Sequence, residues 1–295
     1  MLVPLRYDHV DVFSPRPYSG NSLAVFAEAA ELKTPQMALI TRELRHFESI
    51  FLEATTDAFT YRARVFDLTG ELDFAGHPLL GAACVLHSRT KGAEVCRWTL
   101  RLRARSVTVE TVAHSVSRFS AVLNQGAAQF LACPREDQRR EIAAWFSLDA
   151  ADLDPTLPPE VISTGLRYLI LPVRGRALER ARIAQPDLEA RLAALGAQFA
   201  YLFDADDLEG RHWNNDGVLE DVATGSGAGC VAAYLRRRNR IESGETVTLR
   251  QGRFVGRPSE IILRAHGEGA DIGRVEVGGE VSLVGCGWLS SVPET

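Results

Sequence analysis

Two turns that contain glycine, each followed by a run of small and apolar residues, are the strongest chemical signal in this sequence. They occupy residues 75–78 (AGHP) and 224–227 (TGSG). The residues after each turn are apolar on nearly every side of a helix, so both helices are predicted to be buried. A helix N-terminus presents unpaired backbone N–H groups and the positive end of the helix dipole. Two such ends directed at one cleft would hold an anion such as a substrate carboxylate.

Glu48 is the first candidate for proton transfer. It lies in the segment FESIFL (47–52), where a surface helix is predicted to end and an apolar strand to begin. Large apolar neighbours would leave its carboxylate poorly solvated, which favours the protonated form and suits a group that takes and returns a proton. The alternative is a glutamate at an element boundary with its head group in water.

Three further polar residues border the turns. His77 follows Gly76 at the start of the first apolar helix and is either a core or capping residue or a catalytic group. Asp221 precedes Gly225 by four positions and is either a turn residue or a group that orients a substrate or His77. Ser226 either caps the second helix or contacts a substrate anion.

The glycine run that begins at Gly225 does not match a dinucleotide-binding fingerprint. Its spacing is G-x-G-x-G, and no strand–helix–strand unit with a later ribose-binding acid surrounds it. The five cysteines are scattered without a C-x-x-C pair, and the seven histidines form no H-E-x-x-H motif. We therefore expect a reducing compartment, no disulfide framework, no metal site and no cofactor.

The composition predicts a soluble globular protein. With 295 residues, 46% of them hydrophobic and 24% charged, the chain suits one large domain or two of ordinary size. A net charge of −5 offers no electrostatic basis for binding nucleic acid or an anionic membrane. The sequence shows neither a signal-peptide core nor an apolar run long enough to span a membrane, so we expect a cytoplasmic protein.

The elements that must position these groups do not alternate strictly between strand and helix. In the first half the pattern predicts helices at 35–46 and 78–88 and strands at 5–13, 22–27, 62–67, 97–103, 106–112 and 117–123. In the second half it predicts helices at 136–147, 187–196 and 227–238 and strands at 161–163, 167–173, 199–203, 246–250, 259–264, 274–277 and 281–284. This order disfavours a doubly wound parallel sheet. The predicted fold is α+β, with a curved sheet or barrel wrapped around a central apolar helix, formed twice.

The spacing of the two turns suggests a duplicated architecture. Gly76 and Gly225 lie 149 positions apart, about half the chain, although the echo between them is weak in identity. The predicted domains are residues 1–124 and 125–295, with the last strand able to return to the first half.

Several ordered motifs along the chain resemble the PhzF-like phenazine-biosynthesis proteins, which share the fold of diaminopimelate epimerase. The matching segments are Asp11-Val12-Phe13, Gly20-Asn21, Glu48-Ser49, the turn at 74–78 with Gly81, Ser163-Thr164-Gly165, Glu220-Asp221 with 223–226, Gln251-Gly252 and 256–259. The resemblance implies two pseudo-symmetric halves with the active site between them, and often a homodimer.

The resemblance also implies a reaction and a set of residues. The reaction is a cofactor-free isomerisation that shifts a proton and a double bond on a small carboxylate-bearing substrate, either dihydro-hydroxyanthranilate-like or derived from an amino acid. The family's catalytic glutamate falls on Glu48, its supporting histidine on His77 and its supporting aspartate on Asp221. The implied substrate-binding residues are Asn21, Gly76, Gly225, Ser226 and Gly227.

Two alternatives to the isomerase stay open: an epimerase or racemase, and a non-catalytic protein that binds small acids. Epimerase relatives use two cysteines, but the aligned positions here are Ala75 and Thr224. Cys84 and Cys230 lie inside the predicted helices, which disfavours a two-thiol racemase. Departures from the usual family pattern cluster near the predicted pocket, so they bear on the substrate more than on the fold; they are Ser22, His46-Phe47, Ile50, Gly227, Cys230 and Trp213-Asn214-Asn215.

Overall fold

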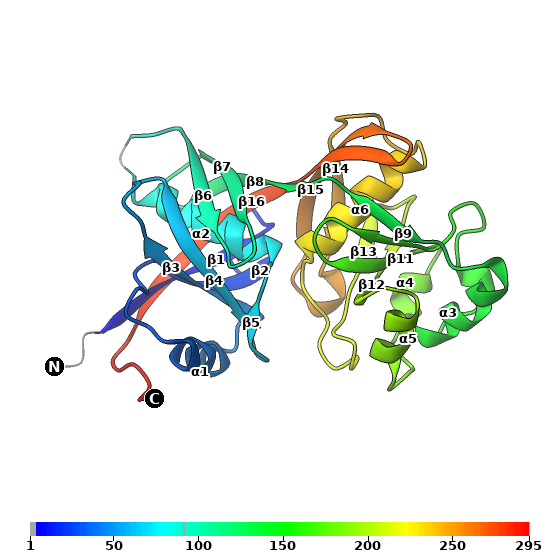
Figure 1. The fold of residues 1–295 in the computed structure, drawn as a ribbon, viewed down its shortest axis with the longest axis horizontal. Helices are drawn as coiled ribbons and strands as arrows, with labels where there is room; N and C mark the ends of the chain where they lie inside the picture. Colours follow the sequence, from blue (N-terminus) through cyan, green and yellow to red (C-terminus); the bar gives the residue numbers. More distant parts are fainter. Residues whose placement is uncertain (1–3, 91, 295) are drawn as a thin grey trace. The chain divides into compact units, whose positions relative to one another are not determined.

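The computed structural model describes residues 4–90 and 92–294, and the chain divides into two compact units. The first unit comprises Met1–Asn124 and Gly278–Thr295, and the second comprises Gln125–Val277. Each unit has one buried helix packed against its strands: α2 (Gly76–Ser88) in the first and α6 (Gly225–Arg237) in the second (Figure 1).

Eight strands close a barrel in the first unit. In order around it they are β1 (Leu5–Val12), β2 (Asn21–Phe26), β3 (Glu48–Ala54), β4 (Thr60–Asp67), β6 (Val95–Arg101), β7 (Ser106–Ala113), β8 (Arg118–Gly126) and β16 (Asp271–Leu289). Strand β16 pairs back onto β1, so the barrel is closed and these strands leave no open edge. The short β5 (Glu71–Leu72) pairs with β4.

Helix α2 packs directly on the barrel strands because its sequence has almost no polar side. Every residue from Gly76 to His87 is buried. Gly81 permits the closest approach, since a Cβ there would lie 2.6 Å from the Leu23 Cδ2 atom and 3.0 Å from a Val10 methyl. A side chain at this position would push the helix away from β1 and β2.

Helix α1 (Thr34–Leu44) packs on the opposite face of the same strands. Its Met37 and Ile40 join a cluster that includes Ala24, Phe26 and Phe51. The helix ends at Leu44, two residues before the predicted end, because Arg45 adopts the left-handed conformation with φ of 56°.

The second unit continues from β16 as a curved sheet. Its strands run in the order β15 (Ser259–Glu268), β14 (Val247–Gln251), β13 (Glu209–Arg211), β12 (Phe199–Asp204), β11 (Arg167–Val173), β10 (Glu160–Ser163) and β9 (Gln129–Ala132). Helix α6 packs on β15, β11 and β10. The remaining helices are α3 (Arg139–Trp145), α4 (Ala177–Arg180), α5 (Leu188–Ala194) and the 3₁₀ turns Glu136–Gln138, Ala150–Asp152 and Arg253–Val255. Apolar residues of α3, α4 and α5 share one core cluster with β11 and β12.

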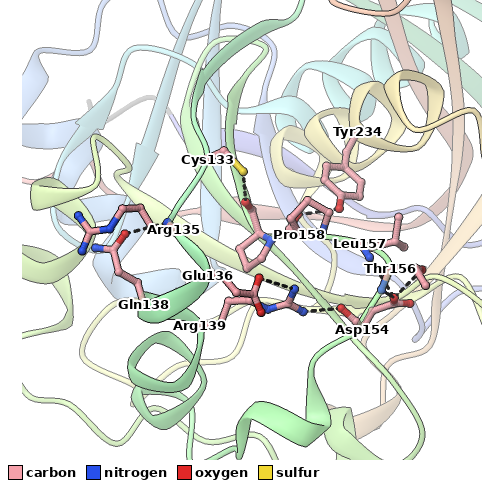
Figure 2. Close-up of polar contacts among 11 residues, drawn as sticks. Cys133, Arg135, Glu136, Gln138, Arg139, Asp154, Thr156, Leu157, Pro158 and Tyr234 are labelled. Atoms are coloured by element: carbon pink, nitrogen blue, oxygen red, sulfur yellow. Dashed lines mark hydrogen bonds and ion pairs between the residues drawn. The ribbon is translucent and has the colours of Figure 1, made fainter.

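The loop at 154–159 is an ordered part of the second unit. The Asp154 carboxylate accepts hydrogen bonds from the backbone N–H groups of Thr156 and Leu157, and Arg139 donates to the Asp154 carbonyl (Figure 2). The Tyr234 hydroxyl of α6 donates to the Pro158 carbonyl at 2.7 Å (Figure 2). The loop therefore belongs to the packed body of this unit and is not a linker.

The α+β class and the strands around a central apolar helix are confirmed, with some corrections to individual elements. The predicted strands at 274–277 and 281–284 form one strand, β16. Gly278 marks a close strand contact there, since a Cβ would lie 2.5 Å from the Ala121 carbonyl oxygen. The sequence patterns also missed β5, β9, β13 and α4, all of them four residues or shorter. No helix in residues 4–90 and 92–294 is long and apolar enough to cross a membrane.

Candidate active site

Glu48 and His77 form a buried pair in the first unit. Glu48 is the first residue of β3, and His77 is the second residue of α2. The His77 Nδ1 atom lies 3.1 Å from the Glu48 Oε2 atom, with 7% of Glu48 and 4% of His77 exposed. The boundary position of Glu48 does not place its head group in bulk water. At this distance the carboxyl and the imidazole nitrogen can share one proton.

Strand pairing explains how Glu48 reaches the helix. Glu48 pairs with Leu23 on the parallel strand β2 and with Asp67 on the antiparallel strand β4. Alternate residues of a strand point to opposite faces, and Phe51 belongs to the cluster beneath α1. Glu48 therefore projects toward the face on which α2 packs.

Asn21 joins this pair from the neighbouring strand. It begins β2, is buried, and its Nδ2 atom lies 3.5 Å from the His77 Nδ1 atom. The contact is long, and the Asn21 amide N–H donates to this nitrogen only when the ring carries no proton there. Three of the predicted site residues, Asn21, Glu48 and His77, thus meet at one imidazole nitrogen. Gly76 is the first residue of α2, directly before this histidine, and the helix has no side-chain hydrogen bond at its N-cap, Ala75.

Asp221 is held by the turn that leads into α6 in the second unit. It is buried, and its Oδ2 atom accepts a hydrogen bond from the Thr224 hydroxyl at 2.6 Å. Its Oδ1 atom accepts a longer bond, 3.4 Å, from the backbone N–H of Ala223. The short Thr224 bond fixes the direction in which the carboxylate points.

Ser226 does not cap α6. The N-cap position belongs to Thr224, and Ser226 is the second residue of the helix. The Ser226 and Tyr168 hydroxyl oxygens lie 2.8 Å apart, and both side chains are buried. The capping alternative for Ser226 is therefore wrong, because the helix starts two residues earlier than a Ser226 cap requires.

Gly225 and Gly227 have structural partners in this unit. The Gly225 carbonyl accepts a hydrogen bond from Gln125 Nε2 at 3.0 Å. Gly227 lies against the Tyr201 ring, where a Cβ would be 2.5 Å from the ring Cδ2 atom. A larger residue at 227 would move α6 or the Tyr201 side chain.

The interior beside Asp221 disfavours charge on two neighbouring aromatic residues. Burial raises the pKa of the Tyr201 hydroxyl, and the nearby Asp221 carboxylate raises it further. Burial also lowers the pKa of His212, although Asp221 acts in the opposite direction. The His212 Nδ1 atom lies 2.9 Å from the Ala200 carbonyl, so this nitrogen carries the ring proton. Both side chains are neutral hydrogen-bonding groups at neutral pH.

Neither helix cysteine is activated for a thiol mechanism. Burial raises the pKa of the Cys84 thiol far above its ordinary value and that of Cys230 to about 12. Their thiols therefore stay protonated, whereas a nucleophile or carbon base of this kind acts as the thiolate.

His46 lies away from the Glu48 pair. Its Nδ1 atom is 2.6 Å from the Ser22 hydroxyl, which also lies 3.1 Å from the His9 Nε2 atom. Ser22 follows Asn21 along β2, so the two side chains point to opposite faces of the sheet. Two departures from the family pattern, Ser22 and His46, therefore belong to one small cluster on the far face from His77.

Trp213 and the residues missed by sequence reasoning lie in the second unit. Trp213 packs on the buried Arg211 guanidinium, 4.3 Å from its ring centroid, and Arg211 pairs with Glu220. Thr224 and Tyr168 touch the predicted site residues Asp221 and Ser226 but were not predicted. Only the motif around 223–226 could have pointed to Thr224, and no local signal marks Tyr168.

Residues 4–90 and 92–294 contain no cluster of three or more His, Cys, Asp or Glu placed to hold a metal ion.

Known proteins are similar to this chain in both sequence and fold. A family model described as phenazine biosynthesis-like protein, PhzC-PhzF, matches residues 10–287. The trans-2,3-dihydro-3-hydroxyanthranilate isomerase of Pseudomonas aeruginosa is 33% identical, over 93% of this chain and 95% of that protein.

Solved structures extend the comparison. A predicted epimerase from Pseudomonas aeruginosa superposes with a TM-score of 0.92 and 48% identity, covering 97% of this chain and 99% of the other. A probable proline racemase from Agrobacterium radiobacter shares the fold alone, with a TM-score of 0.64 and 12% identity over 97% of this chain and 93% of that one.

Proposed function

The chain belongs to the PhzC-PhzF family of phenazine biosynthesis-like proteins, and from this premise we propose that it is a cofactor-independent isomerase that moves a proton and a double bond on a small carboxylate-bearing substrate. The observation that carries the proposal is the 3.1 Å contact between Glu48 and His77. In such a pair the buried carboxylate can accept a proton, and the imidazole nitrogen beside it can exchange that proton with the carboxyl.

The proposed reaction uses Glu48 twice. The Glu48 carboxylate removes a proton from one substrate carbon, and the electrons of that C–H bond form a new double bond while the existing one shifts. The protonated Glu48 then returns a proton to the carbon at the other end of the shifted system. His77 contacts the carboxyl throughout and stabilises whichever protonation state the step requires.

The substrate-binding assignments follow the family resemblance. Asn21 and Gly76 in the first unit, and Asp221, Gly225, Ser226 and Gly227 in the second, are proposed to contact or orient the substrate. Backbone N–H groups at a helix N-terminus suit a carboxylate, which supports the roles of Gly76 and Gly225.

The relatives suggest a substrate for the first test. Trans-2,3-dihydro-3-hydroxyanthranilate carries a carboxylate and is named in the relatives that cover almost the whole chain at 31–33% identity. We propose a substrate of this class and a place in secondary metabolism. The same premise supports a cytoplasmic homodimer, and sedimentation equilibrium of the purified chain measures that oligomeric state.

The decisive experiment follows deuterium from the solvent into the product. Wild-type protein and Glu48→Gln are incubated with trans-2,3-dihydro-3-hydroxyanthranilate in D₂O, and the product is analysed by NMR. Removing a general acid/base costs roughly 10²–10⁴-fold in rate, so Glu48→Gln is expected to lose turnover and deuterium incorporation by that factor. Glu53→Gln is the matched control, because Glu53 lies on the same strand but pairs with the exposed Arg62. A loss of less than tenfold in Glu48→Gln would remove this carboxyl from the mechanism.

The same experiment separates the alternatives. One similar structure is named a predicted epimerase, and an epimerase would give deuterium at an inverted stereocentre without a shifted double bond. A non-catalytic protein would bind the acid and leave its deuterium content unchanged.

A further inference from the structure

Gln251 lies at the centre of a buried hydrogen-bond network in the second unit. It is the last residue of β14, and 1% of it is exposed. Its Oε1 atom accepts hydrogen bonds from the Tyr201 hydroxyl at 2.7 Å and from the backbone N–H of Thr224 at 3.0 Å. Its Nε2 atom donates to the Asp221 carbonyl at 2.9 Å and to the Thr224 hydroxyl at 3.0 Å. All four hydrogen-bonding sites of the amide are used.

The Gln251 amide determines the direction in which the Thr224 hydroxyl donates its hydrogen bond. That hydroxyl accepts from Gln251 Nε2, which leaves its own O–H to donate to Asp221 Oδ2 at 2.6 Å. The bonds thus form a directed chain from Gln251 through Thr224 to the carboxylate. Because each bond polarises the next, the chain holds the carboxylate more firmly than one hydrogen bond alone.

The backbone after Gln251 packs closely against the turn that leads into α6. Gly252 has φ of 83°, and a Cβ there would lie 2.6 Å from the Val222 carbonyl oxygen and 2.3 Å from the Arg257 carbonyl oxygen. Only glycine allows this approach, so the end of β14 lies directly against the segment that carries Asp221. The network therefore joins two buried segments that pack closely and is not a contact between surface groups.

We propose that Gln251 is a positioning residue, which orients the Asp221 carboxylate through the Thr224 hydroxyl and thereby sets the rate of the isomerisation. The assignment rests on the proposed function, in which Asp221 orients the substrate. Glutamine is required because the position must accept two hydrogen bonds and donate two. A glutamate cannot donate both, and an aliphatic side chain can supply neither.

The first test compares single and double variants by their kcat for trans-2,3-dihydro-3-hydroxyanthranilate. Gln251→Met keeps the length of the side chain and removes all four hydrogen bonds, and Thr224→Val removes the hydroxyl. Each is expected to lower kcat by about 10- to 100-fold with a smaller change in KM, because a misplaced orienting group can cost about 10² in rate. If Gln251 acts through Thr224, the double variant loses little more than either single one. Independent, multiplicative losses, or a loss below threefold in Gln251→Met, would overturn the proposal.

Two tyrosine variants distinguish a loss of Asp221 positioning from a general loss of stability. Tyr201→Phe removes one buried hydroxyl that bonds to Gln251, and Tyr234→Phe removes one that bonds to the Pro158 carbonyl (Figure 2). Both changes cost one hydrogen bond in the same unit, so their thermal stabilities are expected to fall alike. Only Tyr201→Phe is expected to lower kcat, by about 2- to 10-fold. Equal kcat values for the two variants would count against the network.

A crystal structure of Gln251→Met separates this proposal from the proposed function. Displacement of the Asp221 carboxylate by about 1 Å or more, with loss of the Thr224 bond, supports the positioning role even if the wild type does not turn over the probe substrate. An unmoved carboxylate overturns it. Absence of turnover in the wild type, by contrast, counts only against the substrate proposed above.

Discussion

The N-terminal turns of α2 and α6 use the same backbone device in different surroundings. The turn before α2 has Ala75 at the N-cap and brings His77 beside Glu48, so its polar neighbours are two titratable groups in contact. The turn before α6 has Thr224 at the N-cap, and around it lie Tyr168 and Gln251, which are neutral donors and acceptors. The carboxylate of Asp221 is held there by the hydroxyl of that N-cap residue.

The two units share the packing of a buried helix but differ in the polar groups around its N-terminus. Both place a buried helix against curved strands, and both use a glycine where the helix meets its sheet, Gly81 in one and Gly227 in the other. The polar groups around the two turns have no such correspondence. One unit is suited to move a proton, and the other is suited to hold a carboxylate in one orientation.

The largest effect that tests this contrast is expected at His77. Replacing it by glutamine removes the proton-sharing partner of Glu48 and is expected to lower kcat/KM by about 10²-fold or more. His87→Gln is the matched control, because His87 is equally buried on α2 but bonds to Thr111 and the Ala93 carbonyl. Steady-state kinetics and thermal unfolding of both variants make the measurement. An equal loss of activity in both would show that the contact with Glu48 has no special role.

A smaller effect, on stability, is expected at the glycine where α6 meets its sheet. Gly227→Ala places a Cβ 2.5 Å from the Tyr201 ring, which is buried and cannot rotate away freely. The overpacking is expected to lower the free energy of unfolding by about 1–3 kcal/mol. Gly273→Ala on β16 is the control, since no atom lies within 4 Å of its Cβ, and it is expected to change stability by about 0.5 kcal/mol or less. Urea unfolding measures both, and equal midpoints would contradict the packing argument.

The smallest effect is a pH dependence of stability that comes from the buried His212 in the second unit. Burial lowers the pKa of His212, so below about pH 6.5 the unfolded chain binds a proton that the folded chain does not. The free energy of unfolding therefore falls as the pH falls, by at most about 1.4 kcal/mol per pH unit for this one group. His212→Gln is expected to make the decline between pH 7.5 and 5.5 shallower, because the other histidines titrate in both proteins. Identical slopes in urea unfolding would show that His212 takes up its proton in the folded state.

Much of the fold could be predicted from local patterns. The runs after Gly76 and Gly225 are apolar on nearly every side, and both helices are buried as expected. The resemblance to PhzF-like proteins is confirmed by the family model and the relatives. The sequence was less informative at the end of the chain. The pattern predicted separate strands at 274–277 and 281–284, but one strand, β16, runs through both, and Gly278 between them permits a close strand contact.

The candidate site was only partly predictable, because side-chain partners depend on strand faces and on distant segments. Ser22 and His46 lie close in sequence to Asn21 and Glu48, yet they point away from them, toward His9. Gln251 belongs to a recognised motif, but its four bonds depend on where β14 ends relative to Asp221 and Thr224.

The amino-acid sequence by itself indicated the α+β class and the two buried helices through periodicity within short segments, and it indicated the family through the resemblance of several ordered motifs. Only the tertiary structure decided which groups touch: that Glu48 meets His77, and that Gln251 directs Thr224 toward Asp221. Hydrogen bonds require atoms within about 3 Å and in the right direction. Such positions arise only when strand pairing and helix packing bring distant residues together.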